Sequence, residues 1–193
     1  MGIADLERVT KAMIDGDVDL IQLRAKGHSL EEIVDLAGKL HEVTSAAGVP
    51  LIVNDHAEVA DEVPVEGVHL GQDDDSIAHA RKKAGRKIII GKSTHSLEQA
   101  VAAQPEGADY IGFGPIFATP TKPDYQPIGL TGIKRVHNEA TVPIFCIGGI
   151  KIDNLGQVIA AGARRVAIVS GLLKAPDIAK YARACKAFLN PET

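Results

Sequence analysis

The chain contains 193 residues, of which 45% are hydrophobic, and carries a formal net charge of −4 at pH 7. This length predicts one domain over residues 1–193, and the mixed charges and the absence of Trp argue against nucleic-acid binding. No apolar run approaches the ~20 residues of a membrane span, and the N-terminal residues lack signal-peptide character. Cys146 and Cys185 are far apart, which fits a reduced, cytoplasmic protein better than a disulfide scaffold.

Helical and strand-like segments alternate along the whole chain. Ser29, with Glu32 three residues later, gives the clearest helix start, because the pair has the pattern of a capping box. Helical periodicity and glycine stops predict helices at about 5–16, 29–47, 57–62, 76–84, 96–104, 130–138, 153–161 and 176–189. Short apolar runs predict strands at about 18–26, 49–55, 67–71, 87–93, 108–113, 142–147 and 165–170.

This alternation predicts βα units and a parallel sheet, with seven strands and eight helices. A (β/α)8 barrel has a helix after each of its strands, whereas this chain begins with a helix. The pattern therefore indicates an α/β fold of the (β/α)8 TIM-barrel type whose first strand is missing. An open doubly wound sheet is the competing fold. It is disfavoured because no Gly-x-Gly-x-x-Gly motif follows the first strand and because polar residues end every strand.

Three polar side chains share one face of the first predicted strand. Gln22, Arg24 and Lys26 alternate with apolar neighbours, so the period of two directs all three into the barrel. Burying two cations without an anion is costly. Either they pair with a carboxylate of the barrel, such as Asp55, or they bind an anionic ligand at its mouth.

Acidic residues follow the next two strands, as Asn54-Asp55 and as Gln72-Asp73-Asp74-Asp75. Carboxylates on neighbouring strand ends can share one hard cation, and Mg2+ is commonly held by one or two carboxylates and a substrate phosphate. Asp73 and Asp75 have the character of a solvated acidic run. Asp55 is the stronger candidate ligand, because it is expected to lie beside the basic side chains of the first strand.

Glycines and hydroxyls follow the last three strands. The loop after Phe113 contains Thr119, Thr121 and Lys122, which are suitable phosphate donors, but its prolines are equally typical of a rigid surface loop. Gly148-Gly149 and Ser170-Gly171 end the last two strands, where such barrels frequently bind phosphate through backbone N–H groups.

Three further polar residues have structural as well as functional interpretations. Ser93 ends a strand, where it could cap the following turn. His69 lies within a short apolar strand and is interpreted as a core histidine. His95 is a candidate general base, although a lone histidine near a helix start is more often structural.

The motifs together resemble thiamine-phosphate synthase. The resemblance runs from the first helix to the C-terminus, and its Gln-x-Arg-x-Lys and Thr-x-Thr-Lys elements are specific in combination. In order, the matching segments are residues 22–26, Asn54-Asp55, 69–74, 91–93, 119–122, 147–150 and Val169-Ser170.

The resemblance implies a transferase that joins a hydroxymethylpyrimidine diphosphate to a thiazole phosphate and releases pyrophosphate with Mg2+. Pyrophosphate would leave first, and the thiazole nitrogen would capture the resulting cation. By position, the resemblance assigns the pyrimidine diphosphate to Gln22, Leu23, Arg24, Ala25, Lys26, Asn54, Ser93 and Lys122. It assigns Mg2+ to Asp55 and Asp74, and the thiazole phosphate to Thr119, Pro120, Thr121, Gly148, Val169 and Ser170. Catalysis would depend on Arg24, Lys26, Ser93 and Lys122.

The chain departs from the family in lacking its first strand. The strands at Leu20 and Val166 would then be sheet edges, which can pair with another chain, so a homo-oligomer is one expected partner beside the phosphorylated substrates. Two alternatives stay open. One is a thiazole tautomerase with His95 as its acid–base group, and the other is a truncated, non-catalytic phosphate-binding barrel. Lys122 and the Asp55–Asp74 pair favour the synthase, because a tautomerase has no diphosphate to bind.

Overall fold

The computed structural model describes residues 3–119 and 126–189. Within these residues seven strands alternate with nine helices. The strands are β1 (Ile21–Leu23), β2 (Leu51–Asn54), β3 (Gly67–Leu70), β4 (Ile89–Thr94), β5 (Tyr110–Phe113), β6 (Ile144–Ile147) and β7 (Val166–Ala167). The helices are α1 (Ile3–Asp15), α2 (Leu30–Ala46), α3 (Val59–Glu62), α4 (Ile77–Lys83), α5 (Leu97–Ala102), α6 (Leu130–Glu139), α7 (Ile152–Ala160), α8 (Ser170–Leu173) and α9 (Ile178–Leu189).

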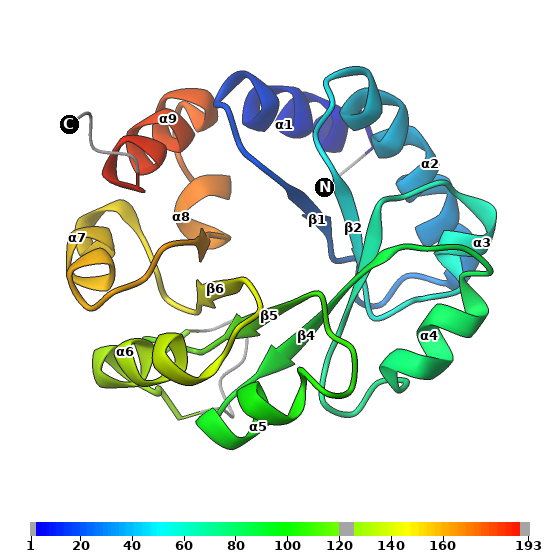
Figure 1. Ribbon diagram of the computed structural model, residues 1–193. Helices are drawn as coiled ribbons and strands as arrows, with labels where there is room; N and C mark the ends of the chain where they lie inside the picture. Colours follow the sequence, from blue (N-terminus) through cyan, green and yellow to red (C-terminus); the bar gives the residue numbers. More distant parts are fainter. Residues whose placement is uncertain (1–2, 120–125, 190–193) are drawn as a thin grey trace.

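All strands are parallel and pair in the order in which they follow one another in the chain, from β1 to β7. The sheet curls, and the helices surround it on the outside (Figure 1). Strands β1 and β7 are its two edges, and among the described residues no strand joins them. The predicted barrel-type sheet with one strand position unfilled is therefore confirmed.

The main core lies between the outer face of the sheet and the helices. Leu51 and Val53 of β2, Val68 of β3 and Ile111 and Phe113 of β5 are buried there. Strands β3 and β5 are buried on both faces, as expected for parallel strands covered by helices on one side and by the barrel interior on the other. Each buried Leu, Val, Ile or Phe contributes about 1.5–3 kcal/mol, so this layer dominates the stability of the barrel.

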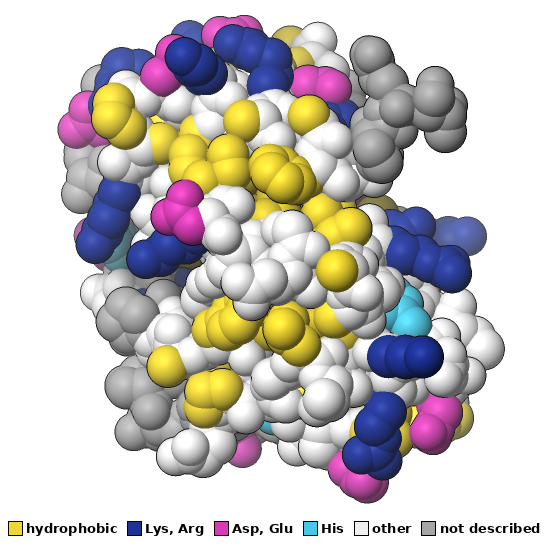
Figure 2. Space-filling view, turned by 90° about the vertical axis from the view of Figure 1, so that its left-hand side faces the viewer, with side chains coloured by type: hydrophobic (Ala, Val, Ile, Leu, Met, Phe, Trp, Pro, Cys, Tyr) yellow, Lys and Arg dark blue, Asp and Glu magenta, His cyan; other side chains and the backbone are white. Residues whose placement is uncertain are grey.

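Helices α1, α8 and α9 pack against one another beside the two sheet edges, β1 and β7 (Figure 1). A Cβ atom at Gly16, which follows α1, would lie 2.5 Å from Cβ of Ala182 in α9, so glycine permits the close approach of these helices. A small second core, consisting of Val9, Leu172, Ile178 and Ala182, joins α1, α8 and α9. Figure 2 shows the side of the molecule that carries α7 and α9, where hydrophobic side chains gather on the surface; Phe188 of α9 is 45% exposed.

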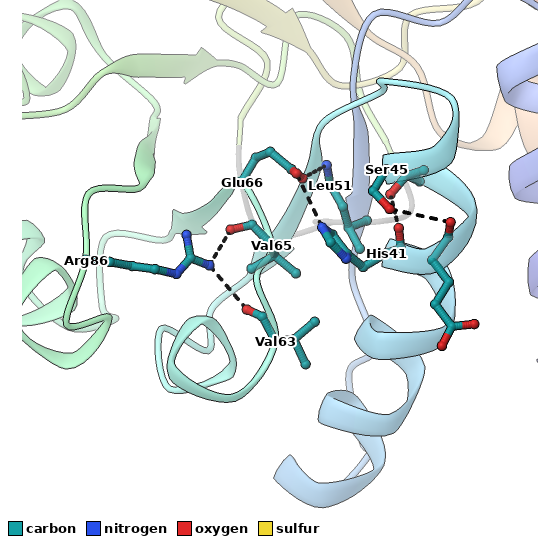
Figure 3. Close-up of polar contacts among 9 residues, drawn as sticks. His41, Ser45, Leu51, Val63, Val65, Glu66 and Arg86 are labelled. Atoms are coloured by element: carbon teal, nitrogen blue, oxygen red, sulfur yellow. Dashed lines mark hydrogen bonds and ion pairs between the residues drawn. The ribbon is translucent and has the colours of Figure 1, made fainter.

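Charged side chains satisfy backbone groups where β2 and β3 begin (Figure 3). The Glu66 carboxylate accepts a hydrogen bond from the N–H of Leu51 at 2.7 Å and lies 3.4 Å from Nε2 of His41. The Arg86 guanidinium donates to the carbonyl oxygens of Val65 and Val63, at 2.7 and 3.2 Å. These contacts pair each charge with complementary groups, which is a stabilising arrangement.

The start of α2 confirms the sequence reasoning, and the end of the last strand corrects it. Ser29 caps α2 in a complete capping box with Glu32. Ser170, predicted to end a strand, is the first residue of α8, which gives nine described helices where eight were expected. Strand β7 has a neighbour on one side only, and its pairing with β6 ends at Ala167. The chain then turns so that Leu172 is buried in the small second core. None of the described helices combines the length and the apolar character that crossing a membrane requires.

Candidate active site

The polar residues singled out from the sequence follow the carboxyl ends of neighbouring strands. Arg24 and Lys26 come after β1, Asn54 ends β2 with Asp55 next to it, and Asp74 follows β3. Because all these strands are parallel, their ends meet at one rim of the barrel. In barrels of this type that rim carries the active site.

Strand β1 ends at Leu23, so Arg24 and Lys26 follow the strand instead of lying within it as predicted. The two cations lie beside a carboxylate, as one of the two sequence interpretations predicted. Nζ of Lys26 is 3.7 Å from Oδ2 of Asp55, and the Lys26 side chain is 63% exposed. An ion pair this exposed contributes little to stability. Arg24 is also exposed, and within residues 3–119 and 126–189 it forms no ion pair. Its charge is nonetheless close enough to lower the pKa of Asp55. The pair with Asp55 therefore leaves positive charge at the rim for an anion.

Two carboxyl groups meet at this rim. Partial burial raises the pKa of Asp55, and the hydrogen bond and negative charge of Asp74 raise it further, against the opposing charges of Lys26 and Arg24. Asp55 has a left-handed backbone (φ 70°), and Asp74 is held by the N–H of Gly71, 2.5 Å from its Oδ2. Two carboxyl groups held close together, although their negative charges repel each other, are typical of a cation site.

The pair fits a divalent cation only in part. Among the described residues there is no group of three or more His, Cys, Asp or Glu side chains that could hold a metal ion. Asp55 and Asp74 would therefore supply two ligands, and a bound ligand or water the others, as is common for Mg2+. Asp75 is not part of the pair, because it lies 2.9 Å from Nζ of Lys83, which also pairs with Glu58 at 2.5 Å.

Ser93 faces the interior of the barrel. Its hydroxyl lies 2.9 Å from Nε2 of His69, and its carbonyl oxygen accepts a hydrogen bond from the Gln72 amide at 2.5 Å. The turn that follows is capped by Ser96 instead, whose hydroxyl accepts from the N–H of Gln99. The interpretation of Ser93 as a turn cap is therefore wrong, because β4 continues through Thr94 and the helix begins later.

His69 is a core histidine, as expected, with 7% of its surface exposed. Sequence reasoning missed its partner Tyr110, which belongs to β5 and lies 2.9 Å from Nδ1 of His69. The available signal was Gly91, which stands between them in the strand register and has no side chain to separate their rings.

Backbone packing shapes the opposite side of the rim. The residues after β5 lie against the turn after β6, because the N–H of Ile116 donates to the carbonyl of Ile147 and that of Phe117 to Gly148. Gly148 has φ 97°, and a Cβ atom there would collide with Pro115, so this turn requires glycine. Thr119 follows directly after this contact. Pro120, Thr121 and Lys122 lie outside the described residues.

The segment after β7 adjoins the same turn. Pairing of Ile147 with Ala167 brings the end of β7 beside the start of the Gly148 turn. Val169 is 44% exposed, and Ser170 begins α8. A Cβ atom at Gly171 would approach the Tyr181 hydroxyl to 2.6 Å, which fixes this segment against α9. The backbone around Gly148, Val169 and Ser170 therefore forms one continuous part of the rim.

His95 makes contacts of a structural kind. Its Nδ1 lies 2.6 Å from the carbonyl oxygen of Gly114, and its backbone N–H donates to the Gln99 side chain at 2.7 Å. These contacts tie the end of β4 to the residues after β5.

Comparison with known proteins gives consistent similarities. The family model described as thiamine monophosphate synthase matches residues 2–172. Thiamine-phosphate synthases of Chloroflexus aurantiacus and Halalkalibacterium halodurans are each 44% identical to this chain, over 94% and 90% of it and over 84% and 82% of their own lengths. The structure resembles a thiamine phosphate pyrophosphorylase of Pyrococcus furiosus with a TM-score of 0.89 and 31% identity, covering 96% of this chain and 89% of that one.

Proposed function

Because the chain belongs to the thiamine monophosphate synthase family, we propose that it joins a hydroxymethylpyrimidine diphosphate to a thiazole phosphate and releases pyrophosphate. The observation that carries the proposal is the meeting of Asp55 and Asp74 beside Lys26 and Arg24. Cations and metal-type carboxyls on one rim suit a group with several negative charges.

The diphosphate binds at the side of the rim formed by β1 to β4. Arg24 can donate two hydrogen bonds to phosphate oxygens, and Lys26 adds a point charge. Gln22 and Asn54 flank them, together with the backbone of Leu23 and Ala25. Ser93 supplies a hydroxyl donor, and Lys122 adds a further cation from outside the described residues. These groups stabilise the negative charge that pyrophosphate gains as it leaves.

The Asp55 and Asp74 carboxyls fit Mg2+, because their proximity disfavours two negative charges unless a cation is present. When bound, Mg2+ supplies positive charge next to the diphosphate.

The thiazole phosphate binds at the other side of the rim, at Thr119, Gly148, Val169 and Ser170. Glycine at 148 leaves the backbone accessible to a ligand, and Thr119 adds a hydroxyl donor. Pro120 and Thr121 belong to the same proposed site and lie outside the described residues.

The reaction then needs positioning more than covalent assistance from the protein. The bond between the methylene carbon and the diphosphate oxygen breaks, and its electron pair leaves with pyrophosphate. The thiazole nitrogen donates its lone pair to the resulting cation and forms the new C–N bond. The residues around the diphosphate offset the leaving charge, and the rim holds both reactants in line.

The tautomerase alternative gains no support from the site. It requires His95 to transfer protons, whereas Nδ1 of His95 contacts the Gly114 carbonyl and Nε2 is buried away from the surface. A tautomerase would also have no use for the Asp55–Asp74 pair.

A coupled assay that follows pyrophosphate tests the proposal. Release should require the pyrimidine diphosphate, the thiazole phosphate and Mg2+ together, and should stop when EDTA is added. Folded protein that binds the thiazole phosphate but never releases pyrophosphate would instead identify a non-catalytic phosphate-binding barrel.

A further inference from the structure

Two polar rings fill the barrel interior below the proposed diphosphate site. His69 of β3 and Tyr110 of β5 are each 7% exposed. Their ring centroids are 5.4 Å apart, and the planes are tilted by 37°. Tyr110 also packs edge-on against Phe145 of β6, at 5.3 Å. The rings therefore span the interior from β3 to β6.

Glycines in the intervening strands create the space for these rings. Gly91 of β4 is in register with both His69 and Tyr110. A Cβ atom at Gly91 would lie 2.5 Å from Nδ1 of His69 and would collide with the Tyr110 ring. At Gly112 it would lie 3.2 Å from Cε1 of His69. The two rings can meet only because both positions lack side chains.

Hydrogen bonds join the rings to each other and to Ser93 of the proposed pyrimidine diphosphate site. Nδ1 of His69 is 2.9 Å from the Tyr110 hydroxyl, and Nε2 is 2.9 Å from the Ser93 hydroxyl. Burial raises the pKa of the Tyr110 phenol, and a hydrogen bond donated by the Gln22 side chain acts in the opposite direction. A continuous chain of hydrogen bonds therefore runs from Tyr110 through His69 to Ser93.

Donor counting gives this chain a direction. Two hydroxyls contact His69, and the phenol of Tyr110 is a stronger acid than the alcohol of Ser93, so Tyr110 donates its single hydroxyl hydrogen to Nδ1 of His69. A neutral imidazole that accepts at Nδ1 carries its hydrogen on Nε2 and donates it to the Ser93 oxygen. The hydroxyl hydrogen of Ser93 then points away from His69.

Resting on the proposed function, we propose that Tyr110 and His69 are positioning residues that hold Ser93 as a hydrogen-bond donor to the diphosphate. A serine hydroxyl can donate or accept a hydrogen bond. Of these two roles, only donation stabilises the negative charge of a leaving pyrophosphate. The buried rings thus fix Ser93 as a hydrogen-bond donor toward the substrate.

The tautomer of His69 tests the proposal without any need for activity. In 15N NMR spectra of the wild-type protein, the His69 ring should carry its proton on Nε2, with Nδ1 as the acceptor. The signal is assigned by its loss in His69→Gln, since the chain has 7 histidines. A proton on Nδ1 would overturn the proposal, whatever the protein catalyses.

A double-mutant cycle tests the connection to the reaction. Tyr110→Phe keeps the ring and its packing, and should lower kcat about tenfold while leaving KM for the thiazole phosphate within about twofold. In a Ser93→Ala background the same change should have almost no further effect, because its action passes through Ser93. Equal effects in both backgrounds would overturn the proposal.

Three further variants separate positioning from stability. Tyr181→Phe removes the hydroxyl of the other described tyrosine, which accepts a hydrogen bond from the N–H of Ile152. Its effect on kcat should add to that of Ser93→Ala. His69→Gln places an amide donor near the position of Nε2 and should retain more activity than His69→Asn, at matched Tm. Equal activities of those two variants at equal Tm would contradict a directed donor at Ser93.

Discussion

The two ends of the barrel use the same kinds of charged residue in opposite ways. At the end where the strands begin, the Glu66 carboxylate accepts from the Leu51 N–H, and the Arg86 guanidinium donates to backbone carbonyls (Figure 3). At the end where the strands finish, Asp55 lies against another carboxyl, and its pKa is raised. Charges at the first end complete the fold, whereas charges at the second are left for a ligand to compensate.

This contrast predicts two separable phenotypes. Substitutions where the strands begin should lower stability and leave turnover per folded molecule unchanged. Substitutions at the opposite rim should lower turnover and leave stability unchanged, or even raise it. The contrast fails if a single substitution lowers both turnover and stability.

Arg24→Ala should have the largest effect. We expect turnover to fall about 100-fold, because an exposed cation that compensates the leaving pyrophosphate is lost. The Tm should stay within about 2 °C of the wild type, since Arg24 forms no ion pair among the described residues. Arg8→Ala is the matched control, because Arg8 is an exposed arginine of α1 outside the proposed site, with an ion pair of 3.5 Å to Asp5. Near-normal turnover of Arg24→Ala would refute its assigned role.

Glu66→Ala should have the next largest effect, on stability alone. It leaves the N–H of Leu51 without its acceptor, which costs about 1–3 kcal/mol and lowers Tm by about 5 °C. Glu62→Ala, an exposed glutamate of α3, should change Tm by about 1 °C or less. Thermal unfolding and the pyrophosphate assay on the same preparations check both values. A loss of turnover per folded Glu66→Ala molecule would break the contrast.

Asp74→Asn should raise the Mg2+ concentration needed for half-maximal turnover about tenfold, because one charged ligand is removed. Asp75→Asn is the matched control, since Asp75 pairs with Lys83 instead of Asp55. Its Mg2+ titration should match that of the wild type. Indistinguishable titrations for the two variants would remove Asp74 from the metal site.

Asp55→Asn should have the smallest effect on stability, and in the unusual direction. The folded state holds the Asp55 proton more tightly than the unfolded chain, because the pKa is raised. Stability is therefore lost as pH rises from the unfolded pKa through the raised one, and removing the charge should restore it. In metal-free buffer at pH 7 we expect Tm to be equal to the wild type or higher by at most about 3 °C. Asn also suits the left-handed backbone at this position.

The same variant should lose the response to metal. Mg2+ should raise the Tm of the wild type, and this rise should shrink as pH falls through the raised pKa of Asp55. Asp55→Asn should show no Mg2+-dependent rise at any pH. A clearly lower Tm of the variant in metal-free buffer would mean that Asp55 serves the fold.

The sequence was sufficient for features that depend on local pattern and strand order. It predicted the capping box at Ser29, the sheet edges at β1 and β7, and the proximity of Lys26 to Asp55, because parallel strand ends meet at one rim. It could not predict that β7 ends early, because the turn into α8 accompanies packing of Leu172 against α1 and α9, which are distant in sequence or follow later.

The interior of the barrel was beyond the reach of local pattern. The contact of His69 with Tyr110 depends on register across β4 and on the missing side chain of Gly91. Neither feature changes the apolar periodicity from which strands are recognised. The contact of Ser93 with His69 was missed for the same reason, since the two residues lie on different strands, 24 residues apart in sequence.

The most direct test of the account is the product balance of the wild-type protein. With the pyrimidine diphosphate, the thiazole phosphate and Mg2+, a quenched reaction analysed by chromatography should contain thiamine phosphate and pyrophosphate in equal amounts. Arg24→Ala protein of the same Tm should form far less of both in the same time. Folded wild-type protein that forms neither product, or that forms pyrophosphate without thiamine phosphate, would contradict the account.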